Sequence, residues 1–319
     1  MATADQLKSL VKAHIDQDND KFKTVVLQIA AAKARQGHTT IARELKDLLE
    51  KSSARKGKIL NFNSQNQLLL MSMPNHKMSE LIVSDEIRER IERVLIEFRS
   101  RKKLGQYGMR NRRKILIEGN PGTGKTLTAS IIASELGLPL FTIQMDKLVT
   151  KFMGETSVKL RQIFDSIESV TGVYLFDEFD AIGADRSMDN EVGEMRRVLN
   201  SFLQFIEQDE SESIIIAATN NQKILDMALF RRFDDVLHYS LPTAAELEML
   251  FKSKLELFST AFFVSDELLE KAASLSHAEI TRICDDAIKS AILSDSDIIS
   301  NEYLIRIIDE RLAVYQRRA

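Results

Sequence analysis

The sequence contains a single cysteine, Cys284, so no disulfide can form within the chain. It also lacks a dominant charge, because 44 Lys and Arg nearly balance 47 Asp and Glu and the formal net charge is −3. No apolar run approaches the roughly 20 residues of a membrane span, and the first residues, MATADQLKSL, carry no apolar signal core. These absences exclude a disulfide-built secreted domain and argue against a strongly basic nucleic-acid binder. We therefore expect a soluble protein of the cytoplasm, with no membrane partner.

The chain of 319 residues is long enough for two or three compact units. Apolar positions recur at spacings of three and four through residues 1–55, which predicts a small N-terminal helical module for partner or substrate binding or for assembly. Residues 56–79 lose this periodicity and collect Ser, Asn, Gln and Lys, which is typical of a linker.

Strands and helices alternate across residues 80–242. Runs such as KILIE and SIIIAATN are apolar almost throughout, which is typical of parallel strands covered on both faces. After Pro242 the strands stop, and residues 243–319 contain four helical stretches. We therefore predict an α/β domain followed by a helical C-terminal domain.

The stretch GNPGTGKT lies between the strand KILIE and the helix TLTASIIASEL. Its glycines allow the backbone N–H groups to point inward, and the helix adds the positive end of its dipole to the same anion site. Lys125 can reach the β and γ phosphates of a nucleotide, and the Thr126 hydroxyl can bind Mg²⁺. A glycine turn of this spacing would arise by chance in about one chain in a hundred. The expected nucleotide-binding residues here are Gly119, Asn120, Pro121, Gly122, Thr123, Gly124, Lys125, Thr126 and Leu127.

Two carboxylates follow the apolar run VYLF. Asp177 can hold the Mg²⁺ shell with Thr126, and Glu178 can orient and polarise the attacking water. The alternative is that acidic residues merely mark the end of a strand. Asp180, in the same stretch, is interpreted as a helix-capping or loop residue. No N-K-x-D motif follows, so ATP is preferred over GTP.

Polar residues further along the chain can complete a hydrolytic site. Asn220 ends the strand SIIIAATN, and ligands bind at the carboxyl ends of strands in open α/β sheets, so it could fix the water or sense the γ phosphate. Arg231 and Arg232, in ALFRRFDD, offer guanidinium groups that stabilise phosphoryl transfer and that a neighbouring subunit can supply. A solvated ion pair is the alternative for these arginines.

In this order and spacing, GNPGTGKT, VYLFDE, AATN and ALFRRFD resemble the AAA+ ATPases, in particular the AAA subgroup that remodels proteins. The resemblance covers about residues 80–293. It implies a P-loop NTPase fold with a parallel five-stranded sheet of order 5-1-4-3-2, a C-terminal helical lid, and hexameric rings with ATP between subunits. The roles that it implies are Walker A for Lys125 and Thr126, Walker B for Asp177 and Glu178, first sensor for Asn220, and arginine fingers for Arg231 and Arg232.

Two further stretches match the family. The segment TKFMGETSVKL resembles the first pore loop, in which an aromatic residue and a flexible Met next to Gly can grip an extended polypeptide. The resemblance assigns this role to Lys151, Phe152, Met153 and Gly154; without it, Phe152 would be an ordinary core residue. In SHAEITRI, the alanine that contacts the base and ribose corresponds to Ala278.

The sequence departs from the family pattern at two places. The finger region usually has the pattern R-x-G-R-F-D but is F-R-R-F-D here, so Arg232 aligns cleanly and Arg231 does not. His277 stands where glycine is usual in the lid.

We therefore predict an ATP hydrolase with the cofactors ATP and Mg²⁺ that forms a homo-oligomeric, hexameric ring and remodels, unfolds or threads protein substrates. A separately encoded partner such as a peptidase would assist it, since no H-E-x-x-H motif is present. The alternative is a nucleotide-switched nucleic-acid accessory ATPase, such as a helicase loader or transposition regulator. Its support would be the basic stretch FRSRKKLGQYGMRNRRK. The complete catalytic set argues against an inactive module.

Overall fold

The computed structural model describes residues 68–148, 155–180, 191–220, 230–255, 262–294 and 298–316, except for the side chains at 191–196 and 314–316. Earlier in the chain it describes only four positions, all helical: Val26, Ile29, Ala30 and Arg43. The chain divides into two compact units, Met1–Asn66 and Gln67–Ala319. Apart from those four positions, the predicted module of residues 1–55 lies outside the described residues.

A six-stranded sheet lies at the centre of the second unit. Its strands are β1 (Leu69–Ser72), β2 (Lys114–Gly119), β3 (Leu140–Ile143), β4 (Val173–Phe176), β5 (Ile214–Thr219) and β6 (Asp235–Tyr239). They lie in the order β1-β3-β4-β5-β2-β6, and all neighbours from β3 to β6 are parallel. Counted along the chain from β2, the five parallel strands have the predicted order 5-1-4-3-2 when read from β6.

Strand β1 was not predicted. It lies within residues 56–79, which we expected to be a linker, and it adds a sixth, antiparallel strand to the five predicted parallel strands. It pairs antiparallel with β3, with Leu69 opposite Ile143. Its partner β3 lies far along the chain, so the residues near β1 do not indicate the pairing. The segment LLMS is also short and lies among Ser and Asn residues, which are typical of a linker.

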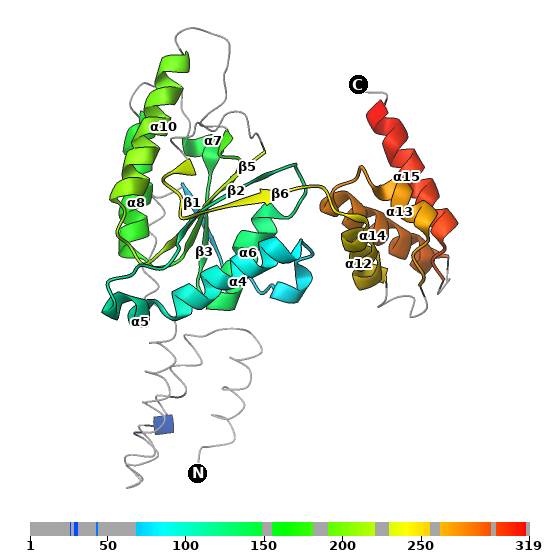
Figure 1. Ribbon diagram of the computed structural model, residues 1–319, viewed down its shortest axis with the longest axis horizontal. Coiled ribbons are helices and arrows are strands. Elements are labelled where there is room, and N and C mark those ends of the chain that lie inside the picture. The colour runs from blue at the N-terminus through cyan, green and yellow to red at the C-terminus, as the bar shows by residue number, and fades with distance from the viewer. Residues whose placement is uncertain are drawn as a thin grey trace. The chain divides into compact units, whose positions relative to one another are not determined.

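Helices cover both faces of the sheet (Figure 1). Ile115 and Ile117 of β2 pack with α4 (Asp85–Arg99) and α6 (Lys125–Leu136), whereas Leu116 faces the core of α8 (Glu155–Ser169) and α10 (Glu191–Gln208). Burial on both faces explains why the strands are apolar throughout. Short elements complete this part: η1 (Met78–Glu80), α5 (Arg101–Gln106) and α7 (Met145–Leu148).

Four helices follow β6 (Figure 1) and share a separate hydrophobic core. They are α12 (Ala244–Leu255), α13 (Asp266–Ala272), α14 (His277–Leu293) and α15 (Asn301–Gln316). These helices match the stretches predicted from sequence. Within the unit Gln67–Ala319 nothing divides residues 80–242 from 243–319, so that boundary stays a prediction. In the described part of the chain, none of the helices is both long enough and apolar enough to cross a bilayer.

Candidate functional site

The loop after β2 is shaped by glycines. Gly119 has φ +150° and Gly122 has φ +75°, both in the region that favours glycine. A Cβ at Gly119 would overlap the Tyr239 carbonyl group on β6, and a Cβ at Gly122 would lie against the Ser276 hydroxyl. The Ala278 N–H of α14 donates to the Gly122 carbonyl at 2.9 Å, so the C-terminal helices contact the loop directly.

Lys125 is the first residue of α6 and is buried. Its Nζ donates to the carbonyl oxygens of Gly119 and Asn120, each at 2.8 Å, which holds the ammonium group inside the curl of the loop. Burial lowers the pKa of Lys125, and the carboxylates of Asp177 and Asp180 oppose this shift. The loop N–H groups, the helix N-terminus and this ammonium group form a site for an anion.

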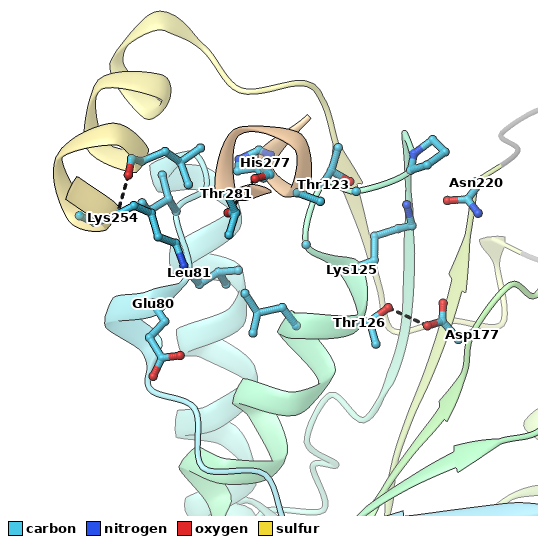
Figure 2. Close-up of a pocket in the computed structure, with 18 of the residues that line it drawn as sticks. Glu80, Leu81, Thr123, Lys125, Thr126, Asp177, Asn220, Lys254, His277 and Thr281 are labelled. Atoms are coloured by element: carbon cyan, nitrogen blue, oxygen red, sulfur yellow. Dashed lines mark hydrogen bonds between the residues drawn. The ribbon is translucent and has the colours of Figure 1, made fainter. Parts of the chain in front are cut away.

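Thr126 and Asp177 meet at the carboxyl end of β4. The Thr126 hydroxyl donates to Asp177 Oδ2 at 2.6 Å (Figure 2). Mg²⁺ prefers oxygen ligands and binds through one or two protein groups, waters and substrate phosphates. The described residues contain no cluster of three or more His, Cys, Asp or Glu that would form a metal cage. This hydroxyl and carboxylate therefore fit a Mg²⁺ ion that shares its coordination with a nucleotide.

Glu178 has a strained backbone. Its φ is +52°, and it is the one non-glycine residue of positive φ in the described part of the chain. The next residue explains this conformation: Phe179 is buried and its N–H donates to the Ala218 carbonyl of β5 at 2.8 Å. Such a backbone costs about 1–3 kcal/mol, and residues of this kind cluster at functional sites. The turn leaves the Glu178 carboxylate exposed at the end of the strand.

Asp180 joins the ends of β4 and β5. Its Oδ1 accepts from the Thr219 hydroxyl and from the Asn220 N–H, both at 3.3 Å. The backbone of Asp180 is helical, and these contacts are structural in kind. The contact also fixes the backbone of Asn220, whose exposed side chain lies at the same end of the cavity as Asp177 (Figure 2).

A cavity of about 460 Å³ brings most of the predicted site residues together. Those that line it are Pro121, Gly122, Thr123, Gly124, Lys125, Thr126, Leu127, Asp177, Glu178, Asn220 and Ala278. Gly119 and Asn120 contribute their carbonyl groups just beneath, to the Lys125 ammonium.

Sequence reasoning did not assign the far end of this cavity. Its lining there comes from three separate segments: Glu80, Leu81 and Ile82 before α4; Leu250, Ser253 and Lys254 of α12; and His277 and Thr281 of α14. Only His277 had a sequence signal, because it lies beside Ala278 in SHAEITRI. The other residues belong to no motif.

The two predicted arginines lie elsewhere and do not line the cavity. Arg231 is exposed, whereas Arg232 is half-buried and its Nε lies 3.4 Å from the Glu207 carboxylate of α10. Arg231 is thus the more accessible guanidinium, although Arg232 is the one that aligns with the family pattern. The predicted pore-loop residues, Lys151 to Gly154, lie outside the described residues.

His277 makes folding sensitive to pH. Burial lowers the pKa of His277, against smaller opposing effects of the Glu246 carboxylate and the Ile82 backbone. Below about pH 6.5 the unfolded chain binds a proton at His277 that the folded protein does not. We therefore expect the free energy of unfolding to decrease as the pH is lowered from about 6.5, until the pH reaches the lower pKa of the folded protein. Within that window the loss is at most about 1.4 kcal/mol per pH unit.

Urea unfolding at neutral pH and at about pH 5.5 tests this expectation. Because all other titrating groups stay the same, the variant His277→Asn should lose less stability on acidification than the wild-type protein. Equal losses in the two proteins would contradict the assignment of this proton to His277.

Comparisons with known proteins agree with this geometry. Residues 115–241 match the family model described as ATPase family associated with various cellular activities (AAA). An uncharacterized AAA family ATPase of Sinorhizobium fredii is 34% identical over 303 residues, which cover 92% of this chain and 90% of that protein.

More distant relatives have more specific names. A putative 26S proteasome regulatory subunit homolog of Methanothermobacter thermautotrophicus is 29% identical, over 62% of this chain and 55% of the relative. An ATP-dependent zinc metalloprotease FtsH of Metamycoplasma arthritidis is 29% identical, over 75% of this chain but 33% of that protein. The near full-length similarity to the Sinorhizobium protein and the match across the nucleotide-binding strands show that this chain belongs to the AAA family and is an ATPase.

Proposed function

We propose that this ATPase works as a homo-oligomeric ring, hexameric in its simplest form, which couples ATP hydrolysis between subunits to the remodelling, unfolding or threading of proteins. One observation carries the proposal. The cavity contains the phosphate loop and the catalytic carboxylates but no arginine among the described residues that line it, whereas Arg231 and Arg232 lie outside it. Phosphoryl transfer gains much from a guanidinium group, and a second subunit is the natural source of one.

In this proposal each residue has a defined task. The loop N–H groups and Lys125 bind the phosphates, while Thr126 and Asp177 hold Mg²⁺, which would neutralise charge on the β and γ phosphates. Glu178 accepts a proton from the attacking water, and Asn220 keeps that water in line. The products are ADP and phosphate.

The choice of protein as substrate rests on two supports. Relatives of the chain are named as a proteasome regulatory subunit homolog and as an ATP-dependent protease, both of which act in protein turnover by name. The sequence KFMG, residues 151–154, further resembles a pore loop, so Phe152 would contact the polypeptide. A separate partner, such as a peptidase, would then receive the processed chain. Capture by the Glu178→Gln variant in ATP would identify the client and any partner.

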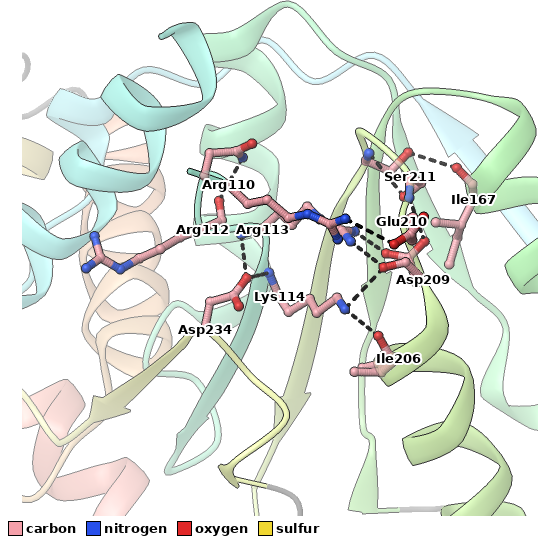
Figure 3. A network of polar contacts seen from close by, with 12 residues as sticks. Arg110, Arg112, Arg113, Lys114, Ile167, Ile206, Asp209, Glu210, Ser211 and Asp234 are labelled. Carbon is pink, nitrogen blue, oxygen red and sulfur yellow. Dashed lines mark hydrogen bonds and ion pairs between the residues drawn. The ribbon is translucent and has the colours of Figure 1, made fainter. Parts of the chain in front are cut away.

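The nucleic-acid alternative loses support because its basic stretch is largely engaged in contacts within the protein (Figure 3). Six of the eight cations in residues 98–114 contact acidic side chains or carbonyl groups: Arg99 contacts Glu135, Arg101 contacts Glu212, Arg110 contacts Glu210, Arg112 contacts Glu97, Arg113 contacts Asp209, and Lys114 contacts main-chain carbonyls. A phosphate backbone would have to compete with these partners. Steep, salt-dependent DNA binding would nevertheless restore this alternative.

A mixing experiment tests whether two copies build one site. We expect Glu178→Gln and the double variant Arg231→Ala/Arg232→Ala to be nearly inactive when separate. When the two are mixed before assembly, some interfaces join an intact Glu178 to an intact arginine pair. For random, equal mixing these are about a quarter of the interfaces, so up to about a quarter of the wild-type ATPase rate should return.

Single arginine variants in the same assay identify the working finger. No recovery on mixing, together with an ATPase rate per chain that is independent of protein concentration, would refute the shared site. Mixing either variant with itself provides the control.

A further inference from the structure

The cavity extends from the phosphate loop to the C-terminal helices. Figure 2 shows Lys125, Thr126 and Asp177 at one end, and Leu81, Lys254, His277 and Thr281 at the other. A nucleoside triphosphate whose phosphates lie on the loop has to direct its base and sugar along this cavity. The inference below therefore rests on the proposed binding of phosphates at Lys125.

His277 has an unusual environment at this far end. Both of its ring nitrogens are buried and lack a hydrogen-bond partner within the described part of the protein. The ring is not needed to cap α14, because the Ser276 hydroxyl accepts from the Glu279 N–H and the Glu279 carboxylate accepts from Ser276. A buried polar group without a partner costs about 1–3 kcal/mol, so a protein retains one where a ligand can satisfy it.

The surroundings define the hydrogen-bonding character of the ring. Burial lowers the pKa of His277, so the imidazole is neutral near pH 7, with one N–H and one acceptor nitrogen. The Ile82 backbone raises the pKa of His277, which is the effect of a carbonyl oxygen near the ring. A carbonyl oxygen near the ring favours a proton on the closer nitrogen even without a hydrogen bond of ordinary geometry, and the other nitrogen is then an acceptor.

Glu80, Ser253 and Thr281 at this end could also accept a hydrogen bond, but each already has a partner in the protein, whereas the His277 ring nitrogens have none among the described residues. The Lys254 ammonium can only donate. The Thr281 hydroxyl already donates to the His277 carbonyl at 2.9 Å. Leu81, Ile82 and Leu250 supply apolar contact for a flat ring.

We propose that the His277 imidazole determines base specificity, by accepting a hydrogen bond from the exocyclic amino group of a 6-aminopurine nucleotide bound in this cavity. A base with a carbonyl group at the same position would place its oxygen, an acceptor, against the acceptor nitrogen of His277, and its binding is disfavoured. A base that lacks the amino group loses the contact.

The test compares the binding of ATP and of purine riboside triphosphate, which lacks the 6-amino group and is otherwise the same size. The wild-type protein should bind ATP about tenfold more tightly, the difference that one hydrogen bond in a buried site makes. In His277→Ala this ratio should fall to about one, whereas His277→Gln, whose side-chain carbonyl can accept, should restore part of it. Thr281→Val is the matched control on the same helix and should change both affinities alike.

Inorganic tripolyphosphate separates this inference from the proposed phosphate site. Its affinity should be unchanged in His277→Ala and lost in Lys125→Ala. Equal wild-type affinities for the two nucleotides, or an unchanged ratio in His277→Ala, would overturn the role of His277. Unchanged tripolyphosphate binding in Lys125→Ala would instead overturn the phosphate site and leave the nucleotide ratio as an independent result.

Discussion

Replacing Glu178 by glutamine should lower the steady-state ATPase rate by at least about 100-fold, because a positioned general base contributes roughly 10²–10⁴ to the rate. Glutamine has nearly the same shape, but its amide cannot accept the proton of the attacking water. The Thr126–Asp177 contact and the Lys125 contacts do not depend on this carboxylate. The affinity for ATP should therefore stay within about threefold of wild type, a change of less than one hydrogen bond.

The measurement needs both quantities from the same preparation, the phosphate release rate and the Kd for ATP. Glu168→Gln provides a matched control, since this exposed glutamate of α8 does not line the cavity. Its rate and affinity should equal those of the wild-type protein. If Glu178→Gln kept hydrolysing ATP at more than about a tenth of the wild-type rate, another group would have to be the base.

The regular elements of the α/β unit could be predicted because their signals are local. β2, β4 and β5 are buried on both faces and therefore consist of apolar runs. Helix α6 begins at Lys125, within GNPGTGKT, and is capped at its C-terminus by Gly137, whose φ of +64° suits that position. Strand β1 could not be predicted in this way, because its stability comes from pairing with a strand far along the chain.

The residues of the candidate site could likewise be predicted only where they lie close together in the sequence. The phosphate loop and the carboxylates after β4 are each a short contiguous motif, and the structure brings them to one end of the sheet. The far end of the cavity joins three distant segments, so Leu81, Lys254 and Thr281 carried no signal on their own. The arginines were predicted from their motif, but the pairing of Arg232 with Glu207 was not, because only the fold brings these two residues together.

The contact between the phosphate loop and α14 has a mechanistic consequence. The Gly122 carbonyl and the Ala278 N–H join the two ends of the cavity, and the lining residues come from the sheet domain and from the C-terminal helices. A nucleotide bound across both parts, as we propose, would change its contacts when the γ phosphate leaves. Movement of the helices relative to the sheet is thus the expected mechanical output of hydrolysis, and the proposed ring would pass it to the substrate.

The largest expected effect on stability comes from the base of the sheet, far along β2 from the cavity. Arg113 and Asp209 form an ion pair whose side chains are 6% and 1% exposed (Figure 3). Asp209 also accepts from the Ser211 N–H at 3.2 Å. Asp209→Ala would leave the buried Arg113 cation without its counter-ion, with only the main-chain carbonyl of residue 209 as acceptor, so we expect the free energy of unfolding to fall by about 3–5 kcal/mol. Urea unfolding measures this loss directly.

The neighbouring residue gives the matched control. Glu210 pairs with Arg110, but these side chains are 76% and 70% exposed, so Glu210→Ala should cost no more than about 1 kcal/mol. The double variant Arg113→Met/Asp209→Leu replaces both buried partners by apolar side chains, so no unpaired charge stays buried. This double variant should recover most of the lost stability. Equal losses in the Asp209 variant and the Glu210 control would mean that burial does not control the energy of this network.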